Sequence, residues 1–103
     1  MSVPAICGAI ASRNLIRFNY TSDLAPGYRV VEPHMIAYNE ANHLSLSGWF
    51  LEGASESNTG QGWREYLLES VFEVTVLPQQ FSRARPGYKP DGGKKFHNVQ
   101  CAL

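Results

Sequence analysis

Hydrophobic and polar residues follow a two-residue repeat most clearly between Tyr28 and Trp49. Two runs rich in β-branched and aromatic residues flank a polar corner at residues 39–42, which predicts a β-hairpin. Successive side chains of a strand point to opposite faces, so the second arm has an apolar face and a polar face with an aromatic end. The polar face carries Ser45, Ser47 and Trp49, and the apolar face carries Leu44, Leu46 and Phe50.

The segment before this hairpin predicts a helix and a strand. Ser2 and Pro4 are typical of a helix start. Apolar residues then recur at helical spacing, which predicts a short helix over residues 3–13. The alternation of apolar and polar residues over 15–20 predicts the first strand.

Two more β-prone runs follow the hairpin, at residues 63–68 and 71–77. Glu69-Ser70 lies between them and forms either a turn or a kink in one long strand. In the second run, a shared face is expected for Phe72, Val74 and Val76.

Proline and glycine mark the breaks in this pattern. Pro33 cannot donate a ladder hydrogen bond, so its strand is expected to be bulged, bent or at an edge there. Residues 21–27 form a turn-rich connection, and residues 53–62 form a surface connector or a lid over a site. From residue 82 the apolar pattern fails, which predicts an irregular arm. Its end, residues 96–103, is expected to dock on the body or on another subunit.

These elements predict a mainly β protein that forms one domain. Residues 1–81 are expected to form a short N-terminal helix followed by a five-stranded, strongly bent antiparallel barrel of the SH3-like or Sm-like type. Residues 82–103 are expected to form the irregular C-terminal arm.

Charge is balanced overall, with nine basic and nine acidic residues, so general attraction to nucleic acid or to an anionic membrane is not expected. The arm is the basic part of the chain. It carries Arg83, Arg85, Lys89, Lys94 and Lys95 against Asp91.

The sequence gives default expectations about location and cysteine chemistry. Without a long apolar run or a signal peptide, a cytoplasmic location without membrane contact is expected. Cys7 and Cys101 show no metal-ligand spacing, and Cys7 lies on an apolar helical face. A buried, inert thiol is therefore favoured, and neither a zinc site nor a cofactor is expected.

Six pieces of the sequence occur in the order seen in one known family. They are "AICGAIASRN", "LIRFNY", "RVVEPHMI", "LSLSGW", "WREYLLESVFEVTVL" and Phe81. In this order the region from Ala5 to Phe81 resembles the WYL domain, a small Sm-like, SH3-type barrel of bacterial transcriptional regulators. Leu44-Ser45-Leu46 stands at the tripeptide that names the family, and Ser70 stands at its second arginine.

The resemblance implies a regulatory sensor for a negatively charged ligand, such as single-stranded DNA or RNA or a nucleotide. Its setting would be bacterial transcription or the control of phage or CRISPR-type defence. The implied ligand-binding residues are Tyr20, Arg29, His34, Ser45, Arg64 and Tyr66, with Trp49 as a further aromatic platform. Arginine offers a planar fork of donors to phosphate, His34 adds a donor or a pH-sensitive charge, and aromatic rings stack on bases.

Structural roles remain open for each of these residues. Arg29 could pair with Glu32 or Glu73, and Arg64 could stack on an aromatic ring. His34 could be a structural histidine, Ser45 an exposed strand serine, and both tryptophans core or rim residues.

Other functional classes also remain open. The chain could be an oligomerisation or protein-interaction module, a homodimer, or the partner of a DNA-binding protein or domain. Its three histidines and Cys7 are scattered, so no nucleophile with its base is apparent and catalysis is not predicted.

Overall fold

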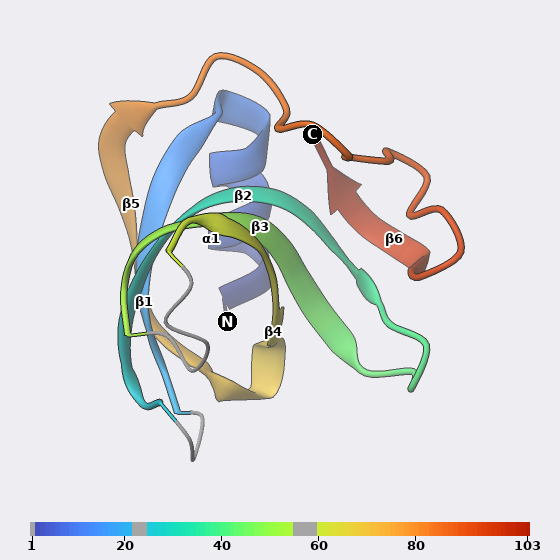
Figure 1. The fold of residues 1–103 in the computed structure, drawn as a ribbon, viewed down its shortest axis with the longest axis horizontal. Helices are drawn as coiled ribbons and strands as arrows, with labels where there is room; N and C mark the ends of the chain where they lie inside the picture. Colours follow the sequence, from blue (N-terminus) through green and yellow to red (C-terminus); the bar gives the residue numbers. More distant parts are fainter. Residues whose placement is uncertain (1, 22–24, 55–59) are drawn as a thin grey trace.

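The computed structural model describes residues 2–21, 25–54 and 60–103. These residues form one α-helix, six strands and a 3-10 turn (Figure 1). In chain order they are α1 (Ser2–Ser12), β1 (Asn14–Tyr20), β2 (Gly27–Tyr38), β3 (Leu44–Gly53), β4 (Gly62–Leu67), the 3-10 turn (Leu68–Ser70), β5 (Val71–Gln80) and β6 (His97–Ala102). The predicted helix, hairpin and first strand are confirmed, and Glu69-Ser70 lies in the 3-10 turn between two strands.

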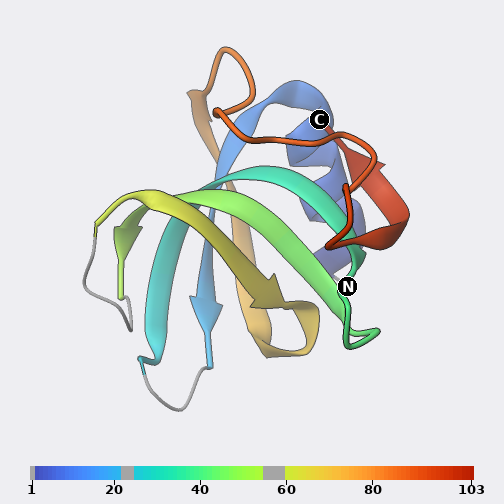
Figure 2. The ribbon, with the colours of Figure 1, turned by 45° about the vertical axis from the view of Figure 1, so that its right-hand side comes forward.

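The strands form one antiparallel open sheet in the order β4-β3-β2-β1-β5, and β6 pairs with β2 beside this path. The sheet is strongly curled (Figure 2). Pro33 pairs with Gly48 and Met35 pairs with Ser47, so His34 is the extra residue of a bulge, as predicted from the proline. The bulge divides β2: its first half pairs with β1, and its second half pairs with β6.

The core lies where α1 packs against the curled sheet. Ile6 and Ile10 are buried against strand residues that include Phe18, Val31 and Leu46. The 3.6-residue period places Ile6 and Ile10 on one side of the helix, and this stripe faces the sheet. The inner face of the sheet is the face that packs on α1, and the outer face is the opposite one.

The expectation of an irregular tail was wrong at its end, because His97–Ala102 forms β6. The strand lies mostly exposed, so it lacks the apolar alternation that reveals a strand in sequence. The strand forms because of a tertiary contact: β6 pairs with the part of β2 that follows the bulge. The expectation that the chain end docks on the body is confirmed.

The expectation of an inert thiol was also wrong. Cys7 and Cys101 form a disulfide that joins α1 to β6, 94 residues apart in sequence, with Cα atoms 5.8 Å apart. The pairing arises because both α1 and β6 pack on β2. Disulfides persist mainly in oxidising compartments, so a cytoplasmic location stays a prediction that this bond does not favour. None of the described residues forms a helix long and apolar enough to span a membrane.

Candidate functional site

The seven predicted ligand residues lie on two faces of the sheet. The register pairs Leu46 with Tyr66 and Gly48 with Arg64, which puts Tyr66 and Arg64 on the inner face. It pairs Ser45 with Leu67 and Trp49 with Trp63 on the outer face. The structure thus brings together Tyr20, Arg29, Arg64 and Tyr66, and separates them from His34, Ser45 and Trp49.

Two guanidinium groups and three aromatic rings form the inner-face cluster, which consists of Tyr20, Arg29, Phe50, Arg64 and Tyr66. The rings of Tyr20 and Tyr66 meet edge to face with centroids 5.1 Å apart. The guanidinium carbon of Arg29 lies 5.2 Å from the ring centre of Tyr20, and that of Arg64 lies 5.2 Å from that of Phe50. This geometry is typical of cation–π contacts.

Arg29 is a buried cation whose described contacts include no carboxylate. Its side chain donates to the carbonyl oxygens of Gly27 at 3.0 Å and Ala25 at 2.6 Å, and the residue is only 3% exposed. The two expected acidic partners are engaged elsewhere: Glu32 pairs with Arg85, and Glu73 accepts a hydrogen bond from Asn19. A buried charge is normally neutralised by a paired group, and among the described residues no carboxylate neutralises the charge of Arg29.

The two phenols of the cluster have different roles. Burial raises the pKa of Tyr66 to about 12, although the positive charges of Arg29 and Arg64 act to lower it. The Tyr20 hydroxyl accepts a hydrogen bond from the Leu67 amide at 3.0 Å, which links β1 to the end of β4 across the curl. Arg64 donates to the carbonyl oxygens of Trp63 at 2.9 Å and Gly60 at 2.8 Å.

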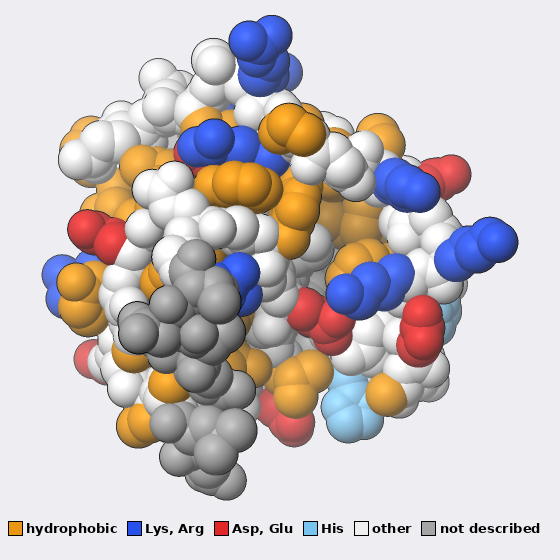
Figure 3. Space-filling model, viewed as in Figure 1, with side chains coloured by type: hydrophobic (Ala, Val, Ile, Leu, Met, Phe, Trp, Pro, Cys, Tyr) orange, Lys and Arg blue, Asp and Glu red, His pale blue; other side chains and the backbone are white. Residues whose placement is uncertain are grey.

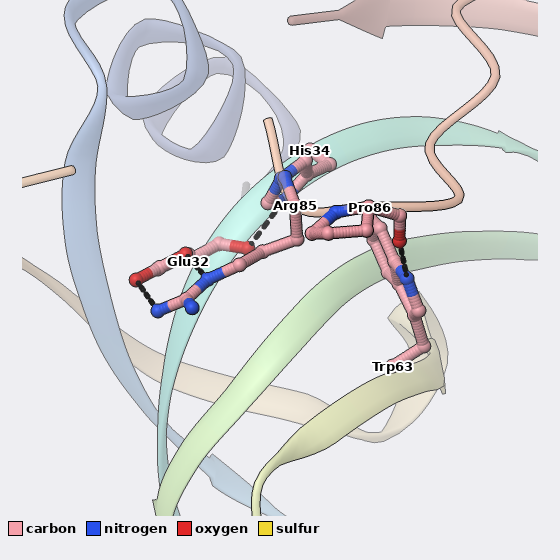
Figure 4. A network of polar contacts seen from close by, with 5 residues as sticks. All are labelled: Glu32, His34, Trp63, Arg85 and Pro86. Carbon is pink, nitrogen blue, oxygen red and sulfur yellow. Dashed lines mark hydrogen bonds and ion pairs between the residues drawn. The ribbon is translucent and has the colours of Figure 1, made fainter. Parts of the chain in front are cut away.

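Residues 82–96 of the arm pack against the outer face. Glu32 and Arg85 form a two-pronged ion pair, with Nε–Oε1 at 2.8 Å and Nη2–Oε2 at 2.9 Å (Figure 4). The Arg85 guanidinium lies 4.9 Å from the ring centre of Trp49. The Trp63 indole N–H donates to the carbonyl oxygen of Pro86 at 2.8 Å.

His34 is fully buried beneath this contact and uses both ring nitrogens within the chain. Its Nδ1–H donates to the Glu32 carbonyl oxygen at 2.8 Å, and its Nε2 accepts the Arg85 amide N–H at 3.1 Å. Burial lowers the pKa of His34, outweighing its hydrogen bond to Glu32 and the charge of that carboxylate. The neutral imidazole of His34 therefore accepts a hydrogen bond from the arm.

Acid is expected to loosen the arm, because a protonated His34 cannot accept the Arg85 N–H. The pKa of His34 is lower in the folded chain than its ordinary 6.5, so the unfolded chain binds the proton more readily. The stabilisation is complete above pH 6.5 and is lost as pH falls from there through the lowered value. Unfolding measured from pH 8 to pH 5 should show this loss in the wild type and a shallower slope in His34→Gln. Identical slopes would contradict it.

A cavity of about 750 Å³ lies between the arm and the outer face of β3 and β4. Aromatic residues line it, and charged groups stand at its rim (Figure 3). The lining includes Trp63, Tyr88, Phe96, Glu65, Lys89, Lys94 and Lys95. Sequence reasoning missed this cavity because one wall exists only once the arm has docked.

Comparison with known proteins returned no match to a family model, to a curated protein or to a solved structure. Across the described ranges, no group of three or more His, Cys, Asp or Glu side chains is placed to hold a metal ion. The candidate chemistry therefore rests on the inner-face cluster and the arm-covered outer face.

Proposed function

We propose that this chain is a regulatory module that binds a negatively charged ligand, a nucleotide or a single strand of DNA or RNA, at the inner-face cluster. In this proposal the curled sheet is an SH3-like or Sm-like barrel of the WYL kind, and it acts in bacterial transcription or defence control through a DNA-binding partner. The observation that carries the proposal is the buried Arg29, which has no carboxylate against it among the described residues.

The two arginines have different parts in this site. Arg29 is enclosed, so it supplies a fixed positive field that reaches far through the weakly polarisable interior. Arg64 is half-buried and stands beside Phe50, so its guanidinium is the group that meets the anion. Tyr66 remains a neutral donor, and the rings offer a surface for a base. His34, Ser45 and Trp49 have no part in this site, because they face the opposite side.

Arg64→Gln is expected to weaken binding of a labelled single-stranded oligonucleotide by about 10- to 100-fold, the value of one charge-assisted contact. Arg17→Gln is the matched control, since Arg17 is an exposed arginine that stacks on the exposed Tyr28 instead. Fluorescence polarisation at two salt concentrations measures both variants, and affinity should fall with salt as counterions are released. Equal affinities of Arg64→Gln and the wild type would remove the proposed site.

A further inference from the structure

The arm is attached to the outer face in the way that a peptide ligand binds a receptor. Within the described residues, no backbone–backbone hydrogen bond joins residues 83–95 to the sheet; those of the arm join its own residues, such as Tyr88 to Arg85. The docking is carried by side-chain contacts around Arg85 and Pro86. We propose that this surface is a groove for a basic Arg-Pro segment of a separate polypeptide, turned at the proline as the arm is, and that the arm occupies the groove in cis.

Three features of the groove recognise the Arg-Pro dipeptide. The Glu32 carboxylate accepts two parallel hydrogen bonds, which the planar guanidinium of arginine can supply and the point charge of lysine cannot. The Trp49 ring lies beneath the same guanidinium. The Trp63 indole then donates to the carbonyl oxygen of the proline, whose fixed φ suits the second position of the turn from Arg85 to Tyr88.

The arm leaves one hydrogen-bond donor of the groove without an acceptor among the described residues. The Trp49 indole Nε1 is buried and has no hydrogen-bond partner among the described residues. A buried donor without a partner is costly, so a segment that places a carbonyl oxygen there gains an advantage over the arm.

The charges define the chemistry of the partner. The sheet contributes carboxylates to this surface, from Glu32 beneath Arg85 and from Glu65 at the cavity. The arm contributes the cations, and Lys95 lies 3.8 Å from Glu65. A segment that replaces the arm must therefore be basic as well as contain Arg-Pro.

The test is a titration of a labelled peptide with the sequence of residues 82–89, SRARPGYK, into four proteins: the wild type, Arg85→Ala, Arg85→Ala/Glu32→Gln and Arg83→Ala. Arg85→Ala weakens the cis contact, so the peptide should bind this variant at least about tenfold more tightly than the wild type. The double variant Arg85→Ala/Glu32→Gln should not bind the peptide. A peptide that carries Arg85→Lys should not bind Arg85→Ala. Arg83→Ala is the matched control, because Arg83 is an exposed arginine of the same arm, and this variant should bind the peptide as the wild type does.

Equal binding to the wild type and Arg85→Ala, or binding to neither, would overturn the proposal. A wild-type dimer that Arg85→Ala dissolves would place the arm of a second copy in the groove and would also overturn it. If Arg85→Ala fails to fold, Arg85→Lys keeps the charge but loses the two-pronged contact. Glu32→Gln should leave oligonucleotide affinity unchanged, which separates this result from that of the anion site.

Discussion

Removing the Cys7–Cys101 bond should lower the free energy of unfolding by about 2–5 kcal/mol. The bond closes nearly the whole chain, because its two cysteines are 94 positions apart, so its loss frees many conformations of the unfolded state. Each kcal/mol shifts the melting temperature of a domain of this size by about 4–8 °C, so the change is readily measured. The measurement is thermal unfolding of the oxidised protein and of Cys7→Ser/Cys101→Ser.

The same variant should also release β6 selectively. This strand pairs with β2 at three positions and lies mostly exposed, so few other contacts hold it. Hydrogen exchange is expected to rise in His97–Ala102 before it rises in β1 or β2. The reduced wild type provides the control, and a melting temperature that does not change on reduction would contradict the prediction.

Arg85→Ala should destabilise the protein by about 1–3 kcal/mol, more than Glu32→Gln does. The reason is burial: the Glu32 side chain is 7% exposed and that of Arg85 is 36% exposed. Without Arg85 a buried carboxylate loses its partner, whereas without the Glu32 charge the arginine can turn towards water. Urea unfolding of the two variants and of the double variant measures this asymmetry.

Arg83→Ala is the control for this comparison, since it removes a neighbouring positive charge from the same arm. Its stability should lie close to that of the wild type. If Glu32→Gln proved as costly as Arg85→Ala, the asymmetry argument from burial would fail.

Local patterns in the sequence were enough to predict most of the elements. The helical period of Ile6 and Ile10, and the alternation through Leu46 and Phe50, reflect burial on one side and are visible without the fold. Alternation failed in β5, where Phe72 and Val76 are 49% and 45% exposed. Register shifts against β1 and the positive φ of Glu73 interrupt the two-residue repeat there.

The candidate site was harder to predict because it depends on contacts between distant segments. The alternation had already separated Ser45 and Trp49 from Leu46, but only the register between β3 and β4 puts Arg64 on the side of Leu46. The docking of the arm could not be predicted from the sequence for the same reason. Arg85 and Glu32 are 53 residues apart, and no local pattern pairs them.

The most direct test of the central claim is an NMR titration of the isotope-labelled protein with a short single-stranded oligonucleotide. Anion binding at the inner-face cluster predicts shifts at Tyr20, Arg29, Arg64 and Tyr66, with the indole signal of Trp49 and the imidazole of His34 unmoved. Shifts confined to the outer face, at the lysines of the arm and the Trp63 indole, would contradict the claim and would place the anion in the arm cavity.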